Sequence, residues 1–173
     1  MKNLCSLLIL VFFLLGCNEV KNSKSLMLDI DLLVKENDSI NIYYTLTDSI
    51  NFTDKNSIWT QVKGSAKNQT INVFFPDSLQ PKQIRIDLGR NTTNKEIVLN
   101  KISLSYLNAS FEAKGEEIYW YFRPDENNTI LDKKSGILQR KDSTQINGPS
   151  LYPKGDKLRE QLNLLYKKEN NVQ

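Results

Sequence analysis

Apolar side chains recur at every second position along much of this chain, and this period limits the fold more than any other feature. The clearest run is at residues 26–34, where five aliphatic side chains alternate with Met27, Asp29, Asp31 and Leu33. Similar short runs follow at residues 40–46, 58–62, 71–75, 84–88 and 102–106. Successive side chains of a strand point to opposite faces, so the alternation predicts strands with one buried face. It favours an antiparallel sandwich or barrel and excludes a doubly wound parallel sheet, whose strands are buried on both faces.

Three segments depart from this simple alternation. The phase slips between residues 97–99 and Ile102, which predicts a β-bulge near Asn100 and Lys101. Residues 118–122 (IYWYF) have the strongest β propensity in the chain and predict a strand that ends before Pro124. Two Pro-containing pairs, at residues 148–149 and 152–153, predict a fixed loop there rather than an element.

The C-terminal segment has a helical period instead. One face of a helix from about Asp156 to Lys168 would carry Leu158, Leu162, Leu165 and Tyr166. We expect this amphipathic helix to pack on the sandwich, with Asp156 as its N-cap, and a helix lying on a membrane is the alternative.

The N-terminal segment has the features of a lipoprotein leader. Lys2 precedes an apolar run at residues 4–15, which is shorter than the roughly 20 residues that a membrane-spanning helix needs. Leu14-Leu15-Gly16-Cys17 resembles the lipobox of bacterial lipoproteins, and an ordinary secretory leader is the alternative. The resemblance implies lipidation of Cys17 and anchoring in the cell envelope, and Asn18 favours the outer membrane facing the periplasm.

These features divide the chain into four parts. They are a signal peptide (1–16), a lipidated tether (17–25), a β-sandwich domain (26–150), and a C-terminal loop and helix packed on the sandwich (151–173).

The residue types present limit the chemistry. The 173 residues include no histidine, and both cysteines lie in the first seventeen positions. The folded part therefore lacks the commonest general base, the commonest transition-metal ligand and any thiol nucleophile. The net charge of +3 is small and scattered, whereas nucleic-acid binders concentrate positive charge on one face. We expect no enzyme, no cofactor, no metal and no nucleic-acid partner.

One stretch of the chain is similar to a known class of domain. Residues 84–87 read Ile-Arg-Ile-Asp, and residues 97–104 read Ile-Val-Leu-Asn-Lys-Ile-Ser-Leu. With the Ile42-Tyr43-Tyr44 strand, they resemble β-sandwich accessory domains attached to bacterial envelope-polysaccharide enzymes, over residues 26–106. The resemblance implies a jelly-roll-like antiparallel β-sandwich in a setting near glycans, and it brings no catalytic residue.

Four side chains are candidates for ligand binding. Arg85 and Asp87 share the exposed face of one strand, where they could hold sugar hydroxyls or form a simple surface ion pair. Trp59 and Tyr43 are out of phase with their core-facing neighbours, so they either stack on a ligand or belong to a second core layer. Asp29 and Asp31 also share a face, but they do not match the spacing of a calcium loop.

Four Asp-Ser pairs precede an apolar residue or threonine, which resembles the acceptor motif of bacterial periplasmic O-glycosylation. The acceptors would be Ser39, Ser49, Ser78 and Ser143. The alternative is that each Asp-Ser pair simply forms a turn before a strand, which both residue types favour.

The sequence predicts a membrane-anchored, non-enzymatic envelope lipoprotein that binds a glycan or another envelope component. The alternative is a structural or assembly subunit of an envelope protein complex. A hydrolase that uses only carboxylates is the least favoured hypothesis.

Overall fold

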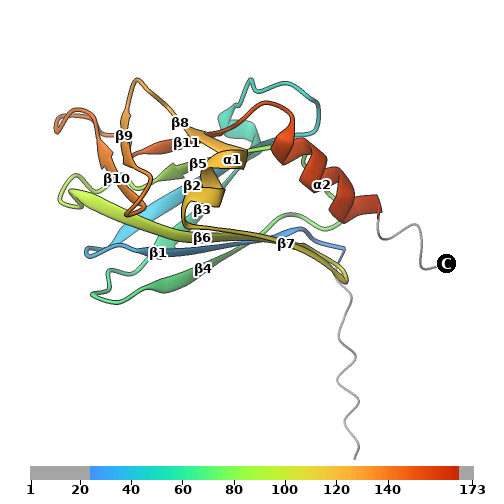
Figure 1. The fold of residues 1–173 in the computed structure, drawn as a ribbon, viewed down its shortest axis with the longest axis horizontal. Helices are drawn as coiled ribbons and strands as arrows, with labels where there is room; N and C mark the ends of the chain where they lie inside the picture. The colour runs from blue at the N-terminus through green and yellow to red at the C-terminus, as the bar shows by residue number, and fades with distance from the viewer. Residues whose placement is uncertain (1–23, 168–173) are drawn as a thin grey trace, which may run out of the picture.

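A computed structural model describes residues 24–167 of the chain, and Figure 1 shows their arrangement. The helices are the two 3-10 turns η1 (Asp54–Asn56) and η2 (Gly115–Glu117), and α1 (Ile118–Tyr121) and α2 (Lys157–Lys167). The strands are β1 (Met27–Leu33), β2 (Asp38–Thr45), β3 (Ser57–Val62), β4 (Gln69–Phe74), β5 (Gln83–Leu88), β6 (Glu96–Tyr106), β7 (Ala109–Lys114), β8 (Phe122–Pro124), β9 (Thr129–Asp132), β10 (Ile137–Arg140) and β11 (Ser150–Pro153).

The strands form two antiparallel sheets that pack face to face (Figure 1). Sheet A has the order β4-β1-β6-β10-β9, and β7 also pairs with the long strand β6. Sheet B has the order β3-β2-β5-β11-β8. The predicted antiparallel β-sandwich with a C-terminal helix is confirmed.

The core lies between the sheets and follows the period of two. Leu28 and Ile30 of β1 and Ile84 and Ile86 of β5 are completely buried. Leu46 is an exception: it continues the β2 alternation in the sequence but is exposed, because β2 ends at Thr45.

The predicted β-bulge is confirmed. Asp31 of β1 pairs with Lys101 of β6, whereas the next residue, Leu32, pairs with Leu99. Asn100 is therefore the extra residue on β6. It returns Leu99 and Ile102 to the same buried face.

The prediction of a strand at residues 118–122 is wrong for its first four residues. They form the single helical turn α1, and only Phe122 enters a strand, β8. The turn follows η2, which begins at Gly115 with a φ of 52°. Ile118 and Tyr119 of this turn and Phe122, the first residue of β8, are all buried. Tertiary packing therefore overrides the β propensity of these side chains.

The prediction of a loop at residues 148–153 is also wrong at its C-terminal end. Residues Ser150–Pro153 form β11, which lies between β5 and β8 in sheet B. The preceding segment is tied to β5, because Gly148 donates to Gly89 O and Leu88 donates to Pro149 O. Short strands that contain Pro have little sequence signal of their own, and here the neighbouring strands decide the structure.

The C-terminal helix packs as expected. Leu158, Leu162, Leu165 and Tyr166 are buried, and α2 lies against one end of the sandwich (Figure 1). The Tyr166 hydroxyl donates to Pro81 O at 3.0 Å, and its ring meets that of Tyr106 edge-on.

The predicted signal peptide, the lipobox and Cys17 lie outside the described residues. The last two residues of the predicted tether are described: Lys24 O accepts from Ser78 N, and Ser25 Oγ donates to Phe75 O. Within residues 24–167 no helix is long and apolar enough to cross a membrane.

Candidate functional site

The outer face of sheet B carries two adjacent cross-strand rows of aromatic and polar side chains. In the first row, Asn41 pairs with Trp59 on one side and with Asp87 on the other, and Asp87 pairs with Ser150. The second row lies one strand period away, where Tyr43 pairs with Arg85 and Tyr152 pairs with Arg123. Because residues two apart on a strand share a face, both rows point away from the core. We call the side chains of these two rows the sheet B platform.

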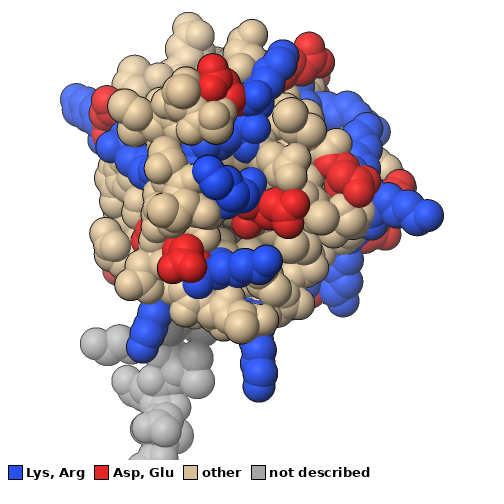
Figure 2. Space-filling model, turned by 90° about the vertical axis from the view of Figure 1, so that its left-hand side faces the viewer, with Lys and Arg blue, Asp and Glu red and all other residues tan. Residues whose placement is uncertain are grey.

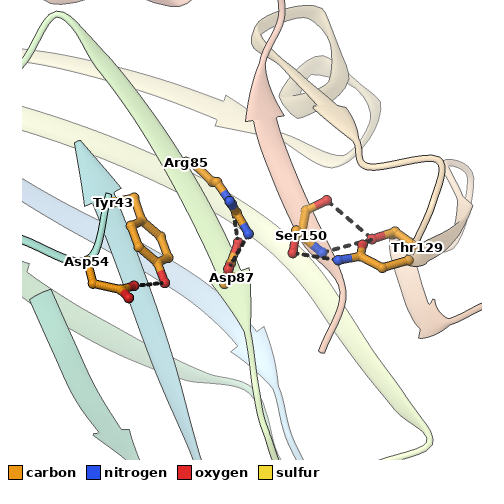
Figure 3. Close-up of polar contacts among 7 residues, drawn as sticks. Tyr43, Asp54, Arg85, Asp87, Thr129 and Ser150 are labelled. Carbon is orange, nitrogen blue, oxygen red and sulfur yellow. Dashed lines mark hydrogen bonds and ion pairs between the residues drawn. The ribbon is translucent and has the colours of Figure 1, made fainter. Parts of the chain in front are cut away.

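An ion pair stands at the centre of the platform (Figure 3). Arg85 Nε and Nη2 donate to the two carboxylate oxygens of Asp87 at 2.7 and 2.6 Å. Their side chains are only 19% and 15% exposed. Burial acts to lower the pKa of Arg85, but the hydrogen bonds and charge of Asp87 outweigh it and hold that pKa above its ordinary value. Arg85 and Asp87 therefore form a partly buried, bidentate ion pair rather than the simple surface ion pair that the sequence offered as the alternative.

Two tyrosine rings enclose the Arg85 guanidinium. Its central carbon lies 4.9 Å from the ring centroid of Tyr43 and 4.5 Å from that of Tyr152. The Tyr43 hydroxyl donates to Asp54 at 2.9 Å (Figure 3). Burial and the Asp54 carboxylate together raise the pKa of Tyr43. The guanidinium is thus held between two rings by cation–π contacts and is hydrogen-bonded to Asp87.

A second arginine stacks on the indole at the edge of the platform. Trp59 is 46% exposed, and the guanidinium carbon of Arg90 lies 4.4 Å from its ring centroid. The backbone of Arg90 is fixed by the buried carboxylate of Asp38, whose Oδ1 accepts from Arg90 N and Asn91 N at 2.6 and 2.9 Å. Asp38 Oδ2 accepts from Asn94 Nδ2 at 2.9 Å. Asp38 therefore anchors the loop after β5, which carries Arg90.

A small pocket of about 10 Å³ lies in the first row of the platform. Its lining comes from β2, β3, β5 and the segments that follow β5 and precede β11, and consists of Ser39, Asn41, Tyr43, Trp59, Asp87, Gly89, Arg90, Asn147 and Gly148. A cavity of this size holds about one water molecule. Asn41 is 1% exposed, and its Nδ2 and Oδ1 have no hydrogen-bond partner within the described part of the chain.

The structure brings the four predicted ligand-binding residues together. Tyr43, Trp59 and Asp87 line the same pocket, and Arg85 holds Asp87. The sequence alone did not mark Asn41, although it shares the period of Tyr43, because an asparagine between core-facing positions is expected to be solvent-exposed. It also missed Tyr152, because that residue lies in the segment predicted as a loop.

The four candidate acceptor serines lie in two different settings. Ser49, Ser78 and Ser143 are exposed and lie outside the strands. Ser39 lies in β2 opposite Gln61, half-buried, next to the buried Asp38. An enzyme that recognises Asp38 together with Ser39 would need β2 to separate from its neighbouring strands. The other three serines lie outside the strands and need no such separation.

The outer face of sheet A carries Asp29 and Asp31, and side chains of neighbouring strands contact both carboxylates. Asp29 accepts from Asn72 at 2.6 Å, and Asp31 accepts from Thr70 and lies 3.5 Å from Lys101 Nζ. Within residues 24–167, no cluster of three or more acidic or cysteine side chains could hold a metal ion.

Charged groups are mixed over the molecule. Figure 2 shows acidic and basic side chains interspersed on one face, without a large patch of one sign. On the sheet B platform and at its margin, Arg85, Arg90 and Arg123 are balanced by Asp54, Asp87 and Asp125. The site is therefore close to neutral.

Comparison of the chain with protein-family models, with curated proteins and with solved structures finds no match.

Proposed function

We propose that this protein is a non-enzymatic, lipid-anchored binding module of the cell envelope and that its sheet B platform binds a neutral polysaccharide. The anchor would be Cys17, in the outer membrane facing the periplasm. The observation that carries the proposal is the platform itself, in which three aromatic rings share one face of the sheet with a partly buried, bidentate Arg85–Asp87 pair.

The chemistry of this surface suits a sugar. Aromatic faces pack on the apolar face of a pyranose ring, and Trp59, Tyr43 and Tyr152 provide such faces on β3, β2 and β11 of the same sheet. Charge-assisted hydrogen bonds from a fixed guanidinium and to a fixed carboxylate can hold vicinal hydroxyls. Both groups are already ordered by each other, so binding a ligand costs little further side-chain entropy.

The balance of charge favours a neutral ligand over an acidic one. The positive charge of Arg85 is matched by Asp87, Arg123 and Asp125 both act on Tyr152, and the Asp54 carboxylate accepts from Tyr43. An acidic glycan would therefore meet as many like charges as opposite ones.

The test is retention on polysaccharide gels. The full-length lipidated protein in detergent is run through gels that contain soluble mannan, xyloglucan, mixed-linkage β-glucan, alginate or hyaluronan. We expect retention by at least one of the three neutral polymers and by neither acidic one. Trp59→Ala should weaken that binding about tenfold or more, equivalent to about 1.4 kcal/mol.

The matched control is Phe74→Ala, which removes an aromatic side chain that is 62% exposed on the edge of sheet A. It should leave retention unchanged. Equal losses in the two variants, or no retention of the native protein by any polymer, would contradict the proposal.

The alternative, an assembly subunit, is favoured by a different surface. Trp120 on α1 and Leu164 on α2 are 55% and 52% exposed, and the two helices are in contact. A stoichiometric protein recovered with the native lipoprotein, and lost with Trp120→Ala, would favour this function.

A further inference from the structure

We propose that Asn41 forms a buried subsite for a single sugar hydroxyl, beneath the stacked pair of Trp59 and Arg90. This inference rests on the proposed function and states how the platform selects its ligand.

The Asn41 side chain is buried without a hydrogen-bond partner in the described part of the chain. It is 1% exposed in the middle of sheet B, and neither polar atom of its side chain is hydrogen-bonded within the described residues. A buried polar group without a partner has lost its hydrogen bonds to water and gained none in return, which destabilises the folded state. Native proteins leave few such groups, and those that persist call for an explanation beyond folding.

Asp38, on the same strand, is buried in the opposite way to Asn41, with every carboxylate oxygen hydrogen-bonded. The Asp38 carboxylate is buried and accepts hydrogen bonds from Ser39, Arg90, Asn91 and Asn94. Three residues further along β2, Asn41 has none. The fold satisfies one polar side chain completely and leaves its neighbour to bind something else.

The pocket beside Asn41 is small enough to select its occupant by size. Asn41 lines a space of about 10 Å³, which has room for one oxygen atom with its hydrogens. A hydroxyl fits this space, whereas an acetamido group or a carboxylate does not. A hydroxyl can donate to Oδ1 and accept from Nδ2 at once, so it satisfies both atoms of Asn41.

The side chains around Asn41 offer further hydrogen-bonding groups and an aromatic surface. Ser39 and Asp87 line the same pocket, so a hydroxyl there has further hydrogen-bond partners. Trp59 forms part of the wall, which lets the sugar ring that carries this hydroxyl lie on the indole. Arg90 occupies that indole face at 4.4 Å. Arg90 is exposed, and this stacking contact is the one interaction that the structure shows for its side chain among the described residues, so the side chain can move aside when the sugar binds.

The test uses Asn41→Leu, which keeps the size of the side chain and removes both polar atoms. Because the unpaired groups are lost, we expect the thermal midpoint of the full-length protein to stay the same or rise. Affinity for the neutral polysaccharide that retains the native protein should fall at least tenfold. The matched control is Asn72→Leu, the same change on the outer face of sheet A, which should not alter affinity.

The outcomes separate this inference from the proposed function. If Asn41→Leu binds like the native protein while Trp59→Ala does not, the subsite is wrong and the platform stands. If the native protein binds no neutral polymer, both fail. If the midpoint of Asn41→Leu falls and affinity is unchanged, Asn41 holds a structural water, and the subsite is wrong.

A second measurement covers the case in which Asn41→Leu does not fold. In ¹⁵N–¹H spectra of the native protein, the side-chain amide of Asn41 is followed while the methyl glycosides of mannose, glucose and xylose are added. We expect this amide to shift with at least one of them and not with glycerol, and the signal is assigned with Asn41→Asp. No shift with any of the three would overturn the subsite.

Discussion

At the scale of single residues, the buried polar side chains divide into those that the fold satisfies and those that it does not. Asp38 and Thr129 are buried and fully engaged, and Thr129 exchanges hydrogen bonds with the backbone of Ser150 (Figure 3). Asn41 and the hydroxyl of Tyr119 are buried without a partner within the described chain. The first kind contributes to stability, and the second lowers it. Only Asn41 of the second pair lines a pocket of the platform.

Tyr119 allows a prediction on pH. Burial raises the pKa of Tyr119 to about 12, and the charge of Asp132 adds to the shift. The folded pKa lies above the unfolded value of about 10, so the folded state holds this proton more tightly. The resulting stability is present below pH 10 and is lost as the pH rises through about 12.

We therefore expect Tyr119→Phe to lose less stability than the native chain between pH 9 and pH 11.5, measured by urea unfolding at each pH. At pH 7 the variant should be as stable as the native chain or about 1 kcal/mol more stable, because it lacks the unpaired hydroxyl. The buried Tyr166 remains in both chains and cancels in the comparison. Equal alkaline losses would show that Tyr119 does not titrate in this way.

At the scale of elements, the position of β11 depends on one glycine. A Cβ atom added to Gly148 would lie 1.8 Å from Leu88 O and 2.4 Å from Gly89 O. This close approach lets Gly148 N donate to Gly89 O at 2.7 Å and places β11 beside β5. It also brings Tyr152 to Arg85. The platform therefore requires a residue without a side chain at position 148.

We expect Gly148→Ala to destabilise the protein by about 3 kcal/mol or more, because backbone oxygens cannot move away from the new methyl group without separating β11 from β5. The control is Gly155→Ala. That glycine has a φ of 58° with open space around it, so its variant should cost only about 1–2 kcal/mol. Urea unfolding measures both, and a smaller loss at position 148 than at 155 would contradict the close packing.

At the scale of the whole molecule, α2 closes one end of the sandwich. Its buried face meets β7 of sheet A and β5 of sheet B, so the helix joins the two layers. The sheet B platform lies on the opposite side of sheet B from the core, and its strands are held from beneath by Ile42, Ile84 and Ile86. The stability of the platform therefore depends on the core and on the helix that covers its end.

We expect Leu162→Ala to destabilise the full-length protein by about 2–5 kcal/mol, because it leaves a cavity where a completely buried side chain filled the space between the helix and the sheets. Leu164→Ala is the matched control on the exposed face of α2, and it should change stability by less than about 0.5 kcal/mol. Both are measured by urea unfolding. Similar losses in the two variants would mean that α2 does not pack through this face.

The sequence by itself determined which side chains of most strands enter the core, the bulge at Asn100 and the buried face of α2. These follow from local geometry, since the periods of two and of 3.6 residues belong to the strand and to the helix. It also marked Tyr43, Trp59, Arg85 and Asp87 as outward-facing. Only the tertiary structure decided which strands are neighbours, because that order depends on packing between segments far apart in the chain. For the same reason it alone decided that residues 118–121 form a helical turn, that residues 150–153 form a strand, and that Asn41 is buried beneath the platform.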